Sequence, residues 1–128
     1  MSKQIIQTNK VPAPIGPYSQ AVIANGFLFA SGQVAFDPVT GELVMDSIQS
    51  ETKQVMENIK AILDEAKISF DHIIKTSIFL SDMQLFGQVN EVYGNYFNSD
   101  FPARETVAVK TLPRNVNVEI SITAVMSL

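Results

Sequence analysis

Runs of hydrophobic and alternating residues predict five β-strands along the chain. The clearest signal is Asn25-Gly26, the pair most favoured in a two-residue hairpin turn, which lies between apolar runs at 20–24 and 27–33. These two runs predict an antiparallel hairpin. The three remaining strands are expected at 73–80, 105–112 and 116–125, the last two joined by Pro113-Arg114-Asn115.

Apolar residues spaced three and four positions apart predict a first helix that ends near Lys67. Asp46 is a suitable N-cap, with Gln49 three residues on as its reciprocal partner. The apolar face consists of Val55, Ile59, Ile62, Leu63 and Ala66. The opposite face carries Glu51, Lys53, Glu57, Lys60 and Asp64, and it is expected to be solvated.

A second helix is predicted to open at Asp82. Its apolar stripe consists of Phe86, Val89, Tyr93 and Phe97. Gly87 and Gly94 lie inside this helix, and each costs about 1 kcal/mol relative to alanine. We therefore expect the second helix to be less regular than the first.

The predicted order is β-β-α-β-α-β-β, an α+β architecture with a mixed sheet and both helices on one face. In the last strand apolar residues alternate with more polar ones. The two sets are Val118, Ile120 and Ile122 against Glu119, Ser121 and Thr123. Because two helices can cover only one face, the second face must meet either water or another subunit, and we favour a subunit.

The segment 11–18 contains three prolines, which remove backbone donors and fix φ. It can therefore be neither a helix nor a central strand. We expect an extended arm that packs on a surface of the domain and ends at Tyr18.

Composition narrows the class of protein and its partners. A length of 128 residues predicts one domain, 1–128. The net charge of −4 and the scattered basic residues disfavour nucleic acid and membrane surfaces as partners, which leaves a small molecule or another protein. The absence of cysteine suits the cytoplasm. We expect no metal, because no cluster has metal-ligand spacing, and no membrane span, because no apolar run reaches about 20 residues.

Two charged residues are candidates for chemistry. Arg104 follows Phe101-Pro102-Ala103 at the entrance of a strand, and a rigidly held guanidinium can bind a carboxylate through two hydrogen bonds. The alternative for Arg104 is a surface salt bridge. Glu119 lies mid-strand among β-branched residues, where glutamate is disfavoured. Such a carboxylate either faces water or is held there for a function.

Four weaker candidates accompany them. Tyr18 either packs against the domain or lines a site, and Asn90 either caps a local kink or supplies a polar group. Ser31 and Gly32 close a strand, where glycine also lets another group approach the backbone. The single histidine, His72, is expected to be a structural or surface residue, because neither a partner nor a metal accompanies it.

Six segments that contain most of these residues occur in the order found in a known family. They are Ile15-Gly16-Pro17-Tyr18-Ser19-Gln20, Ser31-Gly32-Gln33, Glu57-Asn58-Ile59-Lys60-Ala61-Ile62-Leu63, Val89-Asn90-Glu91-Val92-Tyr93, Phe101-Pro102-Ala103-Arg104 and Val118-Glu119-Ile120. Through them the sequence resembles the RidA (YjgF-type) family of reactive-intermediate deaminases, which act on 2-iminobutanoate and 2-iminopropanoate. The resemblance covers nearly the whole chain.

The resemblance implies a chorismate-mutase-like homotrimer with sheets facing inward and a site in each cleft between subunits. It implies hydrolysis of 2-imino acids, or of their enamine tautomers, to 2-oxo acids and ammonia without a cofactor. In this implied site Arg104 binds the substrate carboxylate and Glu119 positions and activates water. The other implied site residues are Tyr18, with a catalytic part, and Ser31, Gly32, Asn90 and Thr106, which line the pocket.

One position departs from the pattern of the family that the chain resembles. Many similar sequences carry Arg-Ser-Cys, whereas this chain has Arg104-Glu105-Thr106. Thr106 can serve through its backbone or as a small polar wall, but a role that needs a thiol is absent. Strand alternation directs Glu105 to the opposite face from Arg104 and Thr106.

Two rival functions stay open at the level of sequence. The same Arg104 pocket suits a non-catalytic regulatory protein that binds a 2-oxo acid, because binding and catalysis share residues. A ribonuclease or translation inhibitor, a label that some similar proteins carry, ranks third. An acidic chain without a basic patch lacks the usual electrostatic features of an RNA-binding protein.

Overall fold

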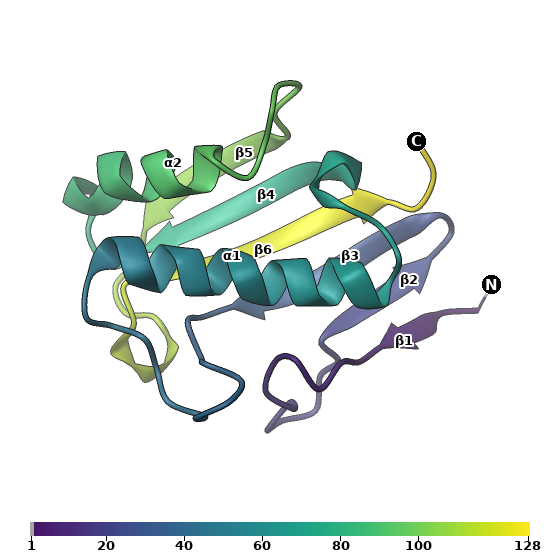
Figure 1. Cartoon of the computed structure of the whole chain (residues 1–128), viewed down its shortest axis with the longest axis horizontal. Helices are drawn as coiled ribbons and strands as arrows, with labels where there is room; N and C mark the ends of the chain where they lie inside the picture. Colours follow the sequence, from purple (N-terminus) through teal and green to yellow (C-terminus); the bar gives the residue numbers. More distant parts are fainter. Residues whose placement is uncertain (1) are drawn as a thin grey trace.

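The computed structural model describes residues 2–128 and shows one mixed six-stranded sheet with two helices on one face (Figure 1). The strand order is β1-β2-β3-β6-β4-β5, and only the β4–β5 pair is parallel within the described sheet. The strands are β1 (Gln4–Ile6), β2 (Ala21–Ala24), β3 (Phe27–Gln33), β4 (Ile73–Leu80), β5 (Ala103–Ala108) and β6 (Val118–Val125). The helices are α1 (Ile48–Glu65) and α2 (Phe86–Gly94). The predicted α+β architecture is confirmed.

The N-terminal strand β1 was not predicted, because three residues are too few to show a periodicity. The chain that follows it is fastened by Gln20, whose Oε1 accepts from the Thr8 backbone N–H at 2.8 Å. The Gln20 Nε2 donates to the carbonyls of Thr8 and Pro12 at 3.2 and 3.1 Å. Val11 is buried while Ile15 is exposed. The start of the proline-containing arm, residues 11–18, therefore packs on the domain, as expected, whereas the arm is exposed to solvent further along.

The predicted hairpin is confirmed. Asn25 and Gly26 have φ of +53° and +83°, the left-handed pair that a type I′ turn requires. Further along β3, the ladder with β6 shifts register between Ala30 and Gln33. This irregularity releases the segment Ser31-Gly32 from regular pairing with β6.

The first helix differs from its prediction at both ends. Ser47, not Asp46, caps it, because the Ser47 Oγ accepts from the Ser50 N–H at 3.0 Å. The helix ends at Glu65 because Lys67 adopts a φ of +63°, a left-handed C-terminal cap. The predicted apolar face is confirmed for its central members. Val55, Ile59, Ile62 and Leu63 are each at most 1% exposed.

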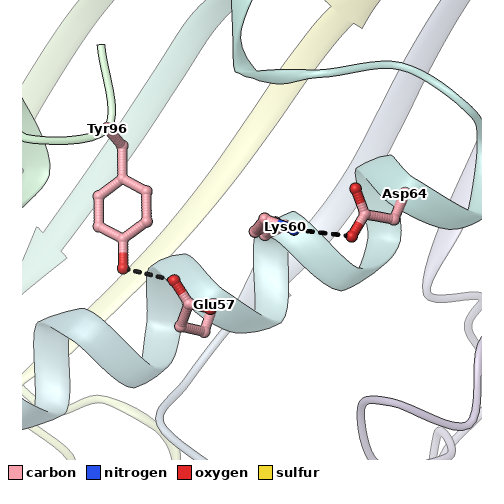
Figure 2. A network of polar contacts seen from close by, with 4 residues as sticks. All are labelled: Glu57, Lys60, Asp64 and Tyr96. Atoms are coloured by element: carbon pink, nitrogen blue, oxygen red, sulfur yellow. Dashed lines mark hydrogen bonds and ion pairs between the residues drawn. The ribbon is translucent and has the colours of Figure 1, made fainter.

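The solvated face of α1 was predicted correctly except for its first member. Glu57 accepts a hydrogen bond from the Tyr96 hydroxyl at 2.7 Å, and the Lys60 Nζ lies 3.0 Å from Asp64 Oδ2, both at the protein surface (Figure 2). Glu51 is instead 0% exposed. The prediction for Glu51 was therefore wrong, because the loop before β6 covers this end of α1 with hydrogen-bond donors.

Asp82 caps a 3-10 turn, Met83–Leu85, that leads directly into α2; its carboxylate accepts from the Gln84 N–H at 2.8 Å. Val89 and Tyr93 of α2 are buried and Phe86 is half-buried, which confirms these members of the predicted apolar stripe. The helix ends at Gly94, so Phe97, the last predicted member, lies beyond it. His72 has a structural contact, as expected. Its Nδ1 accepts from the Ser69 N–H at 3.1 Å.

The strand β4 has its predicted bounds, but the last two strands are displaced. β5 spans Ala103–Ala108 instead of 105–112, because its ladder partner β4 ends at Leu80, opposite Ala108. β6 begins at Val118, two residues later than predicted. The preceding 3-10 turn Pro113–Asn115, in which Arg114 has a φ of +60°, delays the start of the strand.

The alternation predicted for β6 separates two faces of the sheet. Val118, Ile120 and Ile122 lie beneath the helices and are at most 4% exposed, while the residues between them are half-buried on the other side. Neither α1 nor α2 covers that second side, which we call the open face (Figure 1). None of the helices in residues 2–128 is long and apolar enough to cross a membrane.

Large apolar side chains remain exposed on the open face. Cross-strand pairing places Ile5, Phe29 and Val107 there, and their exposed fractions are 48%, 50% and 43%. The face also carries a polar contact, because Glu105 accepts from the Ser77 hydroxyl and lies 2.9 Å from the Lys75 Nζ. Glu105 thus points away from Arg104, as the strand alternation predicts.

Candidate active site

Arg104 on the edge strand β5 points toward the helix-covered side of the sheet. It pairs with Thr76, which is buried and whose Oγ1 lies 2.8 Å from the Tyr93 hydroxyl of α2. The Arg104 Nη1 donates to Asn90 Oδ1 at 2.7 Å. Its Cζ lies 5.5 Å from the ring centroid of Phe86 and 5.1 Å from that of Tyr93. Side chains of α2 therefore hold the guanidinium in place.

The surroundings of this guanidinium are polar and aromatic but not acidic. In residues 2–128 no carboxylate forms an ion pair with Arg104, so the surface salt bridge is not the arrangement that this chain adopts. Asn90, Phe101 and Pro102 line a cavity of about 520 Å³ with it. A guanidinium held by a neutral amide and aromatic faces keeps its charge available for a carboxylate ligand.

Thr106 lies two residues beyond Arg104 on the same side of β5. Its Oγ1 is buried, and it makes no hydrogen bond within the described part of the chain. A buried hydroxyl without a partner costs about 1–3 kcal/mol. A ligand in this region that donates to or accepts from Thr106 offsets that cost.

Glu119 is the second residue of β6 and points to the open face, opposite Phe79 of β4. The carboxylate is half-buried. Burial raises the pKa of this carboxyl above its ordinary value of 4.5, because desolvation disfavours the charged form. A raised pKa makes Glu119 a stronger proton acceptor than an exposed glutamate.

Gly32 lies directly against the Glu119 side chain. A Cβ at position 32 would stand 2.8 Å from the carboxyl carbon of Glu119 and 3.0 Å from its Cγ. Real Cβ atoms essentially never show a contact as short as 2.8 Å, so only glycine leaves room for the carboxylate in this position. The close approach that the sequence allowed at Gly32 is therefore made by Glu119.

Ser31 connects this region to the proline arm. Its hydroxyl donates to the Ser19 carbonyl at 2.6 Å, and its N–H donates to the Gln20 carbonyl at 2.9 Å. These bonds fix the chain beside Tyr18, which is 54% exposed and therefore not packed into the core. Tyr18 and Gly32 line a cavity of about 280 Å³.

A second arginine lines the cavity beside Tyr18 and was not singled out from the sequence. Arg114 was assigned only to a turn, yet its guanidinium lies over the Phe36 ring, 5.4 Å from the centroid, at the cavity that Gly32 also lines. The chain contains two arginines, Arg104 and Arg114, and this scarcity was the signal available in the sequence.

Within one chain the predicted site residues form two groups rather than one. The first consists of Arg104, Asn90 and Thr106, and the second of Glu119, Gly32, Ser31 and Tyr18. Their separation follows from register, because Arg104 pairs with Thr76 and Glu119 with Phe79, three residues apart on β4. An odd spacing directs side chains to opposite faces of a sheet. Within residues 2–128 of a single chain, Arg104 and Glu119 therefore share no cavity.

Comparisons with known proteins place this fold and these residues in a family. The family model described as Endoribonuclease L-PSP matches residues 8–126. The putative regulator AldR of Lactococcus lactis is 50% identical over 121 residues, 94% of this chain and 96% of AldR. The mouse 2-iminobutanoate/2-iminopropanoate deaminase is 45% identical over 123 residues, 96% of this chain and 91% of the mouse protein.

A solved structure shares the architecture over almost its full length. The crystal structure of Escherichia coli TdcF with bound serine superposes with a TM-score of 0.92 at 38% identity, covering 97% of this chain and 99% of TdcF. The fold, the sequence motifs and the sequence identity all indicate the same family over nearly the whole chain. The chain therefore belongs to the Endoribonuclease L-PSP family, the RidA family that its motifs resemble, in which the mouse relative is a named imine deaminase.

Proposed function

We propose that this protein hydrolyses 2-imino acids, or their enamine tautomers, to 2-oxo acids and ammonia. The observation that carries the proposal is the Arg104 guanidinium, which faces a cavity and bonds only the neutral Asn90 among the described polar side chains. A 2-imino acid presents a planar carboxylate next to its reacting carbon. A guanidinium can hold that carboxylate through two hydrogen bonds and so fix the position of the carbon.

The complete site is proposed to form between copies of the chain in a homotrimer. Arg104 and Glu119 cannot meet across the sheet of one chain, and the open face leaves Phe29 and Val107 exposed. Exposed apolar sheet faces are commonly covered by another subunit. In a closed ring, the edge strand that carries Arg104 can approach the open face of the next copy, which carries Glu119.

In the proposed reaction, Glu119 accepts a proton from water as the water oxygen bonds to the imine carbon. The C=N π electrons pass to nitrogen, which takes the same proton back from Glu119, and a neutral carbinolamine results. The Glu119 carboxylate then accepts the hydroxyl proton as the C=O bond forms and passes it to nitrogen as the C–N bond breaks, so that ammonia leaves and the carboxylate is regenerated. Positioning of this kind removes several kcal/mol from a barrier, and proton transfer contributes about 10²–10⁴-fold. Tyr18, Ser31 and the backbone at Gly32 and Thr106 line the bound substrate in this proposal.

The first experiment measures imine hydrolysis directly. A threonine dehydratase generates 2-iminobutanoate, and release of 2-oxobutanoate is followed with and without this protein. We expect the wild-type protein to accelerate release, Arg104→Ala to abolish the acceleration without changing assembly, and Glu119→Gln to lower turnover more than affinity. Glu57→Gln, on the solvated face of α1, serves as the matched control. Retention of most activity by Arg104→Ala would contradict the carboxylate clamp.

A mixing experiment tests whether the site is shared between subunits. Arg104→Ala and Glu119→Gln chains are refolded together in equal amounts. Random assembly leaves both groups intact at about a quarter of the sites if each site draws one group from each of two subunits. Activity should then reappear in the mixture but not in either variant alone. No recovery, with mixed oligomers demonstrated by tagged chains, would contradict a shared site.

A second candidate function is a non-catalytic regulator that binds a 2-oxo acid. It is favoured by the similarity to AldR, a protein named as a putative regulator, and by the serine bound to TdcF. Unchanged 2-oxobutanoate release in the coupled assay, together with calorimetric binding of 2-oxobutanoate that Arg104→Ala removes, would support this candidate over the enzyme.

A ribonuclease function ranks third despite the description of the family model. The net charge of −4 and the absence of a basic run in the sequence disfavour RNA as a ligand. Strongly salt-dependent RNA binding by a nuclease-free preparation of the protein would favour the ribonuclease function.

A further inference from the structure

Glu51 is a buried carboxylate on a helix face that was expected to be solvated. It lies in the first turn of α1 and is 0% exposed. Its Oε2 accepts from the backbone N–H groups of Asn117 and Val118 at 2.8 and 3.2 Å, and its Oε1 accepts from the Asn117 Nδ2 at 2.9 Å. Three donors and the positive end of the helix dipole stabilise a charge that would otherwise be costly to bury.

These bonds hold the chain at the point where β6 begins. Val118 is the first residue of β6, and Glu119 follows it directly. Asn117 is also fixed from the other side, because its carbonyl and its Oδ1 each accept from Ser81 at 3.0 Å. The residues just before this point form an exposed 3-10 turn, Pro113–Asn115. The entry into β6 is therefore anchored by Glu51 on α1 and by Ser81 after β4.

The position of the Glu119 carboxylate depends on where β6 begins. Its side chain lies against Gly32, where even one added methyl group would collide with it. A small rotation or slip of the first two residues of β6 would therefore move the carboxylate away from Gly32. Reacting groups that are misplaced by about 1 Å can lose about 10²-fold in rate.

We propose that Glu51 is a positioning residue for Glu119: its buried carboxylate fixes Asn117 and Val118 and thereby keeps the Glu119 carboxylate against Gly32 on the open face. This inference rests on the proposed role of Glu119 in activating water. Glu51 itself lies on the buried side of α1 and touches neither substrate nor water in the proposed reaction.

The test compares Glu51→Ala with Glu51→Gln in the coupled imine assay. Glu51→Ala removes all three bonds, and we expect kcat to fall about 10–100-fold with KM changed less than about threefold. Glu51→Gln keeps one oxygen for both backbone donors. Rotation of the Asn117 amide restores the third bond, and the Ser81 hydroxyl, which now donates to Asn117, then accepts from its Nδ2 instead. We expect Glu51→Gln to retain kcat within about threefold. Glu57→Ala, on the solvated face of the same helix, is the control and should be unchanged.

A double-mutant cycle separates positioning from general destabilisation. If Glu51 acts through Glu119, adding Glu51→Ala to Glu119→Gln should change the remaining kcat by less than about twofold. An equal loss in both backgrounds would overturn the proposal, as would a wild-type kcat in Glu51→Ala. If Glu51→Ala does not fold, Asn117→Ala keeps the backbone bonds and loses only the side-chain ones. It should lower kcat in the same direction by a smaller factor, and an unchanged kcat would overturn the proposal.

A measurement without turnover keeps this inference separate from the proposed function. Carbon-13 NMR of the Glu119 carboxyl carbon reports its titration whether or not the protein is an enzyme. We expect the midpoint to fall in Glu51→Ala, as the carboxylate leaves its half-buried position, and to stay in place in Glu51→Gln. An unchanged midpoint in folded Glu51→Ala would overturn the positioning role. Absence of wild-type imine hydrolysis would instead overturn the proposed function alone.

Discussion

The carboxylate of Glu119 occupies the space that a side chain at position 32 would need. A Cβ added to Gly32 would stand 2.8 Å from the Glu119 carboxyl carbon. The contact lies between the start of β6, an interior strand of the sheet, and the end of β3, where the pairing with β6 is irregular. The glycine of the Ser31-Gly32-Gln33 segment is thus explained by a neighbour rather than by its own backbone conformation.

Gly32→Ala should lower activity with little effect on stability. The added methyl group displaces the flexible end of Glu119 rather than any backbone, so the free energy of unfolding should change by less than about 1 kcal/mol. The displaced carboxylate should reduce kcat at least about 10-fold. Denaturant unfolding and the coupled imine assay measure the two effects.

Gly87→Ala in α2 is the matched control for that substitution, because a Cβ there meets nothing within 4 Å. It should stabilise the helix by about 0.5–1 kcal/mol and leave kcat unchanged. Wild-type activity in Gly32→Ala would contradict a requirement for the observed position of Glu119.

The pH dependence of catalysis should reveal the raised pKa of Glu119. Burial disfavours the ionised carboxylate, and a general base must be ionised to accept a proton. The enzyme-catalysed rate, after subtraction of the spontaneous rate, should therefore fall as pH drops through a pKa above 4.5. Glu119→Gln should lack this acid limb. An acid limb whose pKa lies at or below the ordinary value for glutamate would contradict burial of the Glu119 carboxylate.

The same shift predicts how Glu119 affects stability. Because the pKa is higher in the folded than in the unfolded chain, ionisation of Glu119 opposes folding above the folded pKa. This cost disappears below the unfolded pKa, where both states are protonated. Glu119→Gln should therefore be at least as stable as the wild type at pH 7, with the difference shrinking toward low pH. Thermal unfolding across that range measures it, and a destabilised variant at pH 7 would contradict the sign.

Thr106→Val should separate ligand binding from stability. The substitution removes a buried hydroxyl that has no partner in residues 2–128, so the protein should be as stable as before or slightly more stable. Affinity for 2-oxobutanoate should weaken by about 5–10-fold if the hydroxyl contacts the ligand. Calorimetry and thermal unfolding give the two values.

Thr76→Val on the neighbouring strand is the control for Thr106→Val, because the Thr76 hydroxyl bonds Tyr93 at 2.8 Å. Removal of that bond should cost about 1 kcal/mol of stability. A Thr106→Val protein that is destabilised like Thr76→Val, with unchanged affinity, would show that the hydroxyl has a structural partner instead.

Asn90→Asp should place a competing carboxylate on Arg104. The Asn90 Oδ1 already lies 2.7 Å from the Arg104 Nη1, so an aspartate there would form an internal ion pair. We expect binding of 2-oxobutanoate to weaken at least about 10-fold, with the fold intact. Asn98→Asp, in the exposed loop after α2, makes the same chemical change away from the site. Equal affinities in the two variants would argue against Arg104 as the carboxylate ligand.

Much of the fold could be predicted because its signals are local. The hairpin follows from Asn25-Gly26, and the bounds of β4 follow from a compact run of β-branched residues. The ends of β5 could not be predicted in this way, because a strand extends only as far as its neighbour in the sheet. The strand β1 is likewise defined by pairing with β2 rather than by a pattern of its own.

The chemistry of the site was predicted less completely. The sequence indicated Arg104 and Glu119 as unusual residues, and the structure shows each in a distinctive environment. It did not indicate that the two lie on opposite faces, because that depends on the register of both strands with β4. The prediction that Glu51 is solvated was wrong for a related reason. Its helical position lies on the face of α1 that also carries the exposed charged residues, but the chain that leads into β6 covers Glu51.

The sequence by itself determined that both helices and every strand except β1 form, which face of β6 is apolar and which family the motifs resemble, since these depend on residues close together along the chain. Only the tertiary structure decided that Glu51 is buried, that Gly32 accommodates Glu119 and that Arg104 lies away from Glu119. The physical reason is distance along the chain: Glu51 bonds Asn117 across 66 positions, and strand register is set by the packing of the whole sheet.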